Sequence, residues 1–304
     1  MKKGYILAAI VMVTVMLFTS GFDASADVHG TQQMHTGSGV RFAYQWNIYG
    51  LRGAQAGTMN PAAELGGLIA QDLYYNWSMG APIFGLAVQE ACAEHLWAVA
   101  VSLAYLGLPV YQNVFNRTLT PVKNGNPRTD CTQFGNFALA LGNPVAFSRD
   151  LPFSAQSAGQ NRSIPGQEQR GIGCIAARFM GVDHIVCSTH LVNGSHAMTR
   201  VYQMNEALAS VHGTSPLILG LDANAIPSEA ALDSPSIFGY TKVDAACAGV
   251  PSCVTAYTHS VISSVATWNR KYDYIFVRGY NPIPRSFVFA LPSWSDHAQV
   301  YGYA

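Results

Sequence analysis

Two apolar runs flank a helical pattern in one stretch of the chain, DHIVCSTHL (183–191) and LILGL (217–221). Both runs are rich in β-branched or other large apolar residues, which is typical of buried strands. Between them, apolar positions repeat at helical spacing over residues 196–212: Val201, Met204, Leu208 and Val211. A strand, a helix and a second strand in succession predict a mixed α/β domain.

Similar segments recur on both sides of this stretch. Further strand-like runs occupy residues 40–49, 82–89, 134–141, 171–179, 272–277 and 298–303. Two more helices are predicted over residues 61–78 and 93–106. Residues 107–133 and 223–270 carry little regular signal, which predicts long functional loops. The chain shows no internal repeat and no linker, so we expect a single domain over residues 41–304.

Composition limits the class of protein. Of the 304 residues, 49% are hydrophobic and 11% are charged, which excludes a disordered chain. Lys+Arg and Asp+Glu both number 17. This balance excludes a protein that binds nucleic acid through a strongly basic surface. It does not exclude an enzyme that acts on phosphodiesters through a bound metal.

The N-terminus is typical of a secretory signal peptide. Lys2 and Lys3 precede an apolar run over residues 5–18, which is shorter than a membrane-spanning helix. Ala24-Ser25-Ala26 then forms a small-x-small cleavage site. We expect cleavage after Ala26, a loose polar tail over residues 27–40, and an exported mature protein, either extracellular or periplasmic.

Six cysteines in an exported chain predict disulfides. They allow 15 pairings, and the sequence alone does not choose among them. Local spacing offers hints. Cys247 and Cys253 bracket a short loop, and Cys174 and Cys187 lie on two runs around a turn. These pairs would leave Cys92 with Cys131.

Polar residues adjoin the strand-like runs: Asn47, Glu90, His190, Asp222, Asn224, Asp273, Asp296 and His297. In α/β folds, polar groups at strand ends converge on one rim, where ligands bind. Two amides, four carboxylates and two imidazoles can therefore share one pocket. Such oxygen-rich groups suit Mg²⁺ or Ca²⁺ better than a metal that prefers thiolates.

This ordered series resembles the endonuclease/exonuclease/phosphatase superfamily, in the manner of a secreted bacterial-type member similar to deoxyribonuclease I. The resemblance covers about residues 41–304, and the order of the motifs carries it because no single motif is specific. It implies an α/β (α+β) fold, a four-layer αββα sandwich with two packed mixed β-sheets. It also implies hydrolysis of a phosphoric ester with a divalent metal, Mg²⁺ or alternatively Mn²⁺ or Ca²⁺.

The resemblance implies a role for each matching position. The metal ligands would be Asn47, Glu90, Asp222, Asn224 and Asp296. The catalytic residues would be His190, Asp222, Asp273 and His297, with Asp273 as the carboxylate partner of His297. The groups that contact the phosphate would be Asn47, Asn136, Arg170 and Asn224.

Two positions depart from the pattern. Ala223 stands between Asp222 and Asn224, where relatives often carry a bulky residue, and we expect looser packing there. The deoxyribonuclease branch has an acidic partner for its second histidine, but Gln133 and Phe134 occupy that neighbourhood here.

Three functions remain open from the sequence. The first is a secreted endonuclease that cleaves nucleic acid, and the sequence favours it. The second is a phosphatase or a lipid phosphodiesterase such as a sphingomyelinase, which would act at a membrane. Residues 255–270 lack the run of large apolar residues that membrane entry would need. The third is a non-catalytic binding relative, which is weakest because every core site position is filled. No obligate protein partner is evident.

Overall fold

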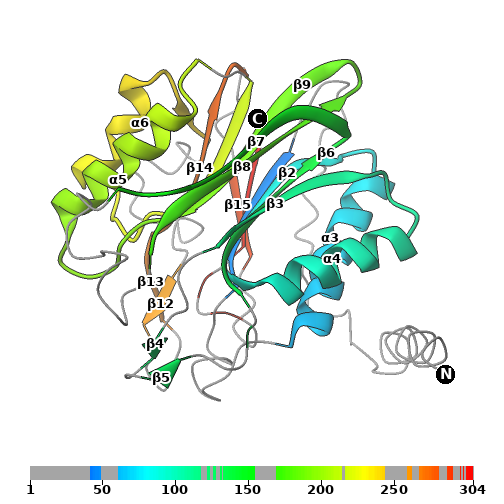
Figure 1. Cartoon of the computed structure of the whole chain (residues 1–304), viewed down its shortest axis with the longest axis horizontal. Coiled ribbons are helices and arrows are strands. Elements are labelled where there is room, and N and C mark those ends of the chain that lie inside the picture. Colours follow the sequence, from blue (N-terminus) through cyan, green and yellow to red (C-terminus); the bar gives the residue numbers. More distant parts are fainter. Residues whose placement is uncertain are drawn as a thin grey trace. The chain divides into compact units, whose positions relative to one another are not determined.

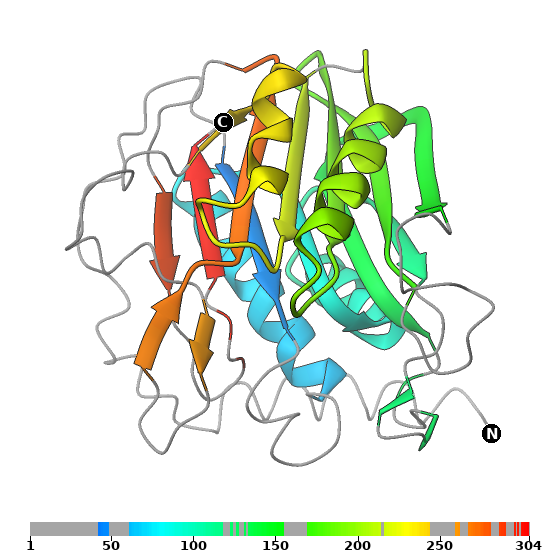
Figure 2. The same cartoon turned by 90° about the vertical axis from the view of Figure 1, so that its left-hand side faces the viewer.

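Two β-sheets pack face to face in a computed structural model of the chain, and helices cover their outer faces (Figure 1). The structure describes residues 42–48, 61–117, 122–123, 126–127, 131, 133–154, 169–213, 216–243, 259–261, 267–280, 286–289, 295, 297 and 299–303. All of them belong to one unit, residues 36–304. Within this unit Figure 1 shows the layers in the order helices, sheet, sheet, helices, and in Figure 2 α5 (Ala197–Ser210) and α6 (Ser234–Ile237) lie in front of the sheets.

The first sheet is built around a parallel pair of strands, with antiparallel strands on both sides. Its strand order is β15 (Ser286–Phe289), β16 (Gln299–Tyr303), β1 (Phe42–Asn47), β2 (Ile83–Cys92), β6 (Phe134–Leu141) and β3 (Tyr111–Arg117). The parallel pair is β1 and β2, and α3 (Ala62–Ser78) connects them. A second helix, α4 (Ala93–Tyr105), follows β2 and packs on α3.

The second sheet repeats this plan. Its strand order is β11 (Thr241–Lys242), β14 (Asp273–Arg278), β10 (Leu217–Asp222), β9 (Val182–His190), β8 (Gly171–Phe179) and β7 (Asn143–Pro152). The parallel pair is β9 and β10, which α5 (Ala197–Ser210) connects. Short helices η1 (Ala230–Leu232) and α6 (Ser234–Ile237) follow β10. Two small hairpins complete the described elements: β4 (Val122–Lys123) with β5 (Asn126–Pro127), and β12 (His259–Val261) with β13 (Thr267–Arg270).

The two faces of the first sheet differ in the size of their side chains. Along β6, large and small residues alternate: Phe137, Leu139 and Leu141 against Ala138 and Ala140. The large residues pack with α3 and α4, and the alanines face the second sheet. The sheets approach so closely that a Cβ added at Gly220 would lie 2.5 Å from Cβ of Ala87. The parallel pairs also end at one edge of the sandwich, where the side chains of Asn47 and Asp222 are in contact.

The structure confirms the mixed α/β class and the predicted helices and strands, with small shifts of their ends. The prediction of a loop over residues 107–133 is wrong for β3, and β7 was not predicted either. Both are edge strands, and their residues include Asn, Gln, Arg, Asp and Pro. One side of an edge strand faces solvent, so polar residues and proline are tolerated there and the strand signal weakens.

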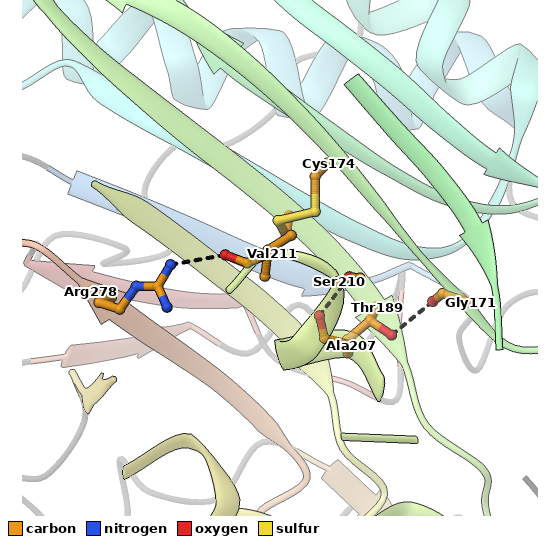
Figure 3. Close-up of a disulfide and its surroundings, with 8 residues drawn as sticks. Gly171, Cys174, Thr189, Ala207, Ser210, Val211 and Arg278 are labelled. Atoms are coloured by element: carbon orange, nitrogen blue, oxygen red, sulfur yellow. Dashed lines mark hydrogen bonds between the residues drawn. A yellow bond between two sulfur atoms is a disulfide. The ribbon is translucent and has the colours of Figure 1, made fainter. Parts of the chain in front are cut away.

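The structure contains the Cys174–Cys187 disulfide that the spacing suggested and the Cys92–Cys131 disulfide that remained. Cys92–Cys131 joins the end of β2 to the segment before β6, and Cys174–Cys187 joins neighbouring strands β8 and β9. The second disulfide lies under α5 in the buried core (Figure 3). The predicted Cys247–Cys253 pair lies outside the described residues.

Candidate active site

Polar side chains gather at one edge of the sandwich, where strands of both sheets end. β1 ends at Asn47, β9 at His190 and β10 at Asp222. In the second sheet, Asp222 lies opposite His190 on one side and opposite Asp273 on the other. β14 is antiparallel to β10, so it begins at this edge with Asp273. Strand register alone therefore brings these groups together.

Two of the site residues hold an uncommon backbone conformation. Glu90 has φ 53° and Asn224 has φ 48°, both in the left-handed region. The pairing of β2 with β6 shifts register between Val88 and Ala91, so Glu90 lies on a bulge. A bulge of this kind redirects a side chain that a regular strand would point elsewhere. Left-handed non-glycine residues cost about 1–2 kcal/mol each and cluster at functional sites.

Amide groups connect the carboxylates of the two sheets. Nδ2 of Asn47 donates hydrogen bonds to Oε1 of Glu90 at 3.2 Å and to Oδ2 of Asp222 at 2.9 Å. The backbone N–H of Asn224 donates to Oδ1 of Asp222 at 2.8 Å. Asn47 comes from the first sheet and Asp222 from the second, so these bonds join the halves of the site.

His297 and Asp273 form a buried pair. Nδ1 of His297 lies 2.8 Å from Oδ2 of Asp273, and both side chains are almost fully buried. A carboxylate accepts, so Nδ1 carries the proton in this bond. Nε2 of His297 then faces the site, 3.7 Å from Oδ2 of Asp222. The indole N–H of Trp46 donates to the His297 carbonyl at 3.1 Å and holds this segment against β1.

His190 lies on the other side of Asp222, with its Nε2 3.3 Å from Oδ2 of that residue. Burial lowers the pKa of His190 well below its usual range, and the nearby Arg170 and His297 lower it further. The imidazole is therefore neutral at pH 7. Its Nε2 lies 2.8 Å from Nδ2 of Asn224, which donates to it. Nδ1 has no hydrogen-bond partner in the described part of the chain, which agrees with the absence of an acidic residue at Gln133 and Phe134.

The carboxylates form an environment suited to a cation. Burial raises the pKa of Asp222 to about 6, and the Asp273 carboxylate also raises it. Ligand atoms of Glu90, His190 and Asp222 lie within 4.8 Å of one another, as do those of Asp222, Asp273 and His297. Hard divalent cations prefer oxygen ligands, and a bound cation would favour the ionised form of Asp222. The donor set therefore fits the metal that the sequence resemblance implies.

Solved structures share the fold of this chain, although no family model and no protein of curated function matches the sequence. An endonuclease/exonuclease/phosphatase structure from Beutenbergia cavernae is 15% identical, with TM-score 0.60, over 86% of this chain and 70% of that chain. The human nocturnin catalytic domain with bound sulfate anion is 18% identical, with TM-score 0.60, over 87% and 92% of the two chains. TDP2 from D. rerio complexed with single strand DNA product is 15% identical, with TM-score 0.58, over 87% and 98%.

The chain has the fold of the endonuclease/exonuclease/phosphatase superfamily. The four-layer sandwich with two mixed sheets, which the sequence resemblance implied, is confirmed. Within this endonuclease/exonuclease/phosphatase fold, most of the predicted site residues form one connected cluster: Asn47, Glu90, His190, Asp222, Asn224, Asp273 and His297.

Among the described residues, the hydrogen bonds that join this cluster do not involve Arg170 or Asn136. Arg170 precedes β8 and is buried, close enough to His190 to lower its pKa. Asn136 lies on β6 opposite Asn116 of β3, and its buried Nδ2 has no hydrogen-bond partner in the described part of the chain. Asp296 lies outside the described residues, so its role as a metal ligand stays a prediction.

The buried amides that support the cluster were not predicted from the sequence. Nε2 of Gln45 donates to Oδ1 of Asp273 at 2.8 Å and to Oε1 of Gln89 at 2.6 Å. Nε2 of Gln89 donates in turn to Oγ of Ser188 at 3.0 Å, across the two sheets. These residues are fully buried. A polar residue inside an apolar strand is the signal that could have identified them.

Proposed function

We propose that the chain is a divalent-metal-dependent phosphodiester hydrolase and that its substrate is nucleic acid. One observation carries this proposal. Asn47 and Glu90 of the first sheet and the His297–Asp273 pair both meet Asp222 of the second sheet. A carboxylate site for a cation beside an oriented imidazole is what hydrolysis of an anionic ester requires.

Each group has a task in the proposed reaction. Glu90, Asp222 and the Asn47 amide would hold Mg²⁺, with Asp296 and Asn224 as further ligands. When bound, the metal neutralises phosphate charge. Asp222 and Asn224 orient the attacking water.

The imidazoles act on the phosphate itself. His297, held by Asp273, directs Nε2 at a phosphate oxygen. His190 is neutral because of its burial, so it serves as a hydrogen-bond partner or proton acceptor rather than as a cation. Arg170 and Asn136 are the proposed phosphate contacts on the flank of the site.

Similarity to the TDP2 and nocturnin structures supports the choice of nucleic acid. The D. rerio TDP2 structure holds a single strand DNA product, and the nocturnin structure holds sulfate, an anion of phosphate-like shape. Net charge limits how strongly the protein can attract nucleic acid, because removal of residues 1–26 would leave a mature chain with a slight negative net charge. Affinity for the backbone would then come from the site itself, and not from a basic surface. A phosphatase or sphingomyelinase-like activity is the alternative outcome of the test below.

One comparative assay tests the proposal. Plasmid DNA, RNA, sphingomyelin and inositol phosphates are incubated side by side with the protein and Mg²⁺. We expect cleavage of a nucleic acid, loss of activity on chelation, and loss of most activity in Glu90→Gln. The matched control is Glu64→Gln, which removes the same charge from an exposed position on α3 and should stay fully active. Activity that survives both chelation and Glu90→Gln would overturn the metal mechanism.

We also propose that the protein is exported. Two disulfides support this proposal, because they persist in oxidising compartments. Among the described residues, no helix is long and apolar enough to cross a membrane. The predicted signal peptide lies outside the described residues. N-terminal sequencing of protein from the culture medium or periplasm should begin at Asp27, and an intact Met1 would contradict the export signal.

A further inference from the structure

Two loops carry site residues out of the second sheet. The first, residues 191–196, follows His190 at the end of β9, and the second, residues 223–229, follows Asp222 and contains Asn224. The loops touch directly, because Nδ2 of Asn224 donates to the Leu191 carbonyl at 3.1 Å. The same Asn224 amide lies 2.8 Å from Nε2 of His190, so a shift of either loop would move this amide relative to the imidazole.

Arg200, on the first turn of α5, spans both loops. Its Nη1 donates to the carbonyls of Val192 at 3.2 Å and Gly194 at 2.7 Å, both in the first loop. Its Nε and Nη2 donate to Oε2 of Glu229, in the second loop, at 3.0 and 2.5 Å. The Arg200 side chain is only 5% exposed. One guanidinium group therefore ties the backbone of one loop to a carboxylate of the other.

Further hydrogen bonds secure each end of this connection. Gln203, one turn along α5, accepts from the Val192 N–H at 2.8 Å, so the helix holds Val192 by both backbone groups. Oε1 of Glu229 accepts from the N–H of Ile226 at 3.3 Å within the second loop. Val192 and Glu229, the two ends of the connection through Arg200, are thus each held by a further hydrogen bond.

We infer that Arg200 and Glu229 are a positioning pair that holds His190 and Asn224 in working register. This inference rests on the proposed function, since positioning has meaning only for an active site. Asn224 has φ 48°, in the left-handed region that asparagine adopts more readily than most residues, and its side chain reaches both His190 and the Leu191 carbonyl. A misplacement of about 1 Å in a reacting geometry can cost about 100-fold in rate. Arg200 would therefore act on catalysis through His190 and Asn224.

The test compares two arginines whose guanidinium groups donate to backbone carbonyls near opposite ends of α5. Arg200→Ala removes the positioning pair. Arg278→Ala is the matched control, because Nη2 of Arg278 donates to the Val211 carbonyl just beyond the other end of α5 (Figure 3). Circular dichroism first identifies a temperature at which every variant is fully folded. At that temperature we measure kcat, KM and the hydrogen exchange of peptides from both loops. Arg200→Lys and Glu229→Gln are included in case Arg200→Ala does not fold, because lysine cannot supply the planar fork that reaches both loops.

We expect Arg200→Ala to lower kcat about 10- to 100-fold while KM changes by less than about twofold. Exchange should rise in residues 191–196 and 223–229. Arg200→Lys and Glu229→Gln should show the same changes to a smaller degree. Arg278→Ala should keep the wild-type kcat and raise exchange only near Val211.

The outcomes separate the two proposals. An active wild-type enzyme whose Arg200 variants keep both kcat and loop protection would overturn the positioning pair and leave the function intact. The same holds if Arg278→Ala lowers kcat as much as Arg200→Ala does. A wild-type protein inactive on every phosphoester, with loops that still loosen in Arg200→Ala, would overturn the proposed function and the catalytic meaning of the pair together.

Discussion

Gln45 offers a direct test of how the buried amides support the site. Its Nε2 donates to Oδ1 of Asp273 at 2.8 Å and to Oε1 of Gln89 at 2.6 Å, with no solvent exposure. Gln45→Met keeps the length and approximate volume of the side chain but removes both donors. The substitution therefore isolates the hydrogen bonds from packing, and Asp273 loses one of the groups that fix its orientation toward His297.

The expected loss of stability follows from these two bonds. A buried hydrogen bond to an ionised carboxylate contributes about 1.5–3 kcal/mol, and one between neutral groups about 0.5–1.5 kcal/mol. Gln45→Met should therefore lower the free energy of unfolding by about 2–4.5 kcal/mol, measured by urea denaturation followed by tryptophan fluorescence. Because Asp273 orients His297, kcat should also fall, by about 10-fold or more.

Gln71→Met is the control, since Gln71 is exposed on α3 and the same chemical change there should cost less than about 0.5 kcal/mol. Equal stability of the two variants would refute the assignment of buried donors to Gln45. A destabilised Gln45→Met enzyme with wild-type kcat would instead show that Asp273 needs no support from this amide.

Three other predictions concern separate parts of the molecule. His297→Ala should lower kcat by about 10²–10⁴ without loss of folded structure by circular dichroism, and a fully active variant would remove this imidazole from the mechanism. Replacement of Cys174 and Cys187 by alanine should cost about 2–5 kcal/mol in urea denaturation, and a change under 1 kcal/mol would contradict a structural role. Burial, with Lys242 nearby, lowers the pKa of Lys271 to about 7 from 10.5, so the unfolded chain binds more protons between these values. Stability should therefore rise with pH across that window, by at most about 1.4 kcal/mol per unit, and Lys271→Met should remove this contribution.

Patterns within single segments predicted much of the fold. Helical spacing placed α5, and apolar runs placed the central strands such as β6 and β10, because strands buried on both faces are nearly uniformly apolar. The edge strand β7 was missed because it has Pro144, Arg149 and Asp150 in a strand that is mostly exposed. Its strand pairing depends on β8, a partner that lies far along the chain and that local sequence cannot reveal.

Part of the site was likewise predictable from the sequence, and part was not. Residues at strand ends were predictable because the ends of parallel strands meet at one edge, and Asn47, His190 and Asp222 do so. Arg200 was not predictable in this way, because a single arginine on a predicted helix looks like an ordinary surface residue in the sequence. Its importance lies in contacts with residues 192, 194 and 229, which only the three-dimensional structure shows.

Some site residues lower the stability of the fold, and the nearby disulfides help to offset this loss. Glu90 and Asn224 hold left-handed backbone, and Asp222 is a buried carboxyl whose pKa is raised to about 6, so each makes folding less favourable. Each sheet carries a disulfide near its share of the site. Cys92 follows Glu90 by two residues, and Cys187 precedes His190 by three. A disulfide stabilises mainly by restricting the unfolded chain, so it adds stability without altering the geometry that the chemistry needs.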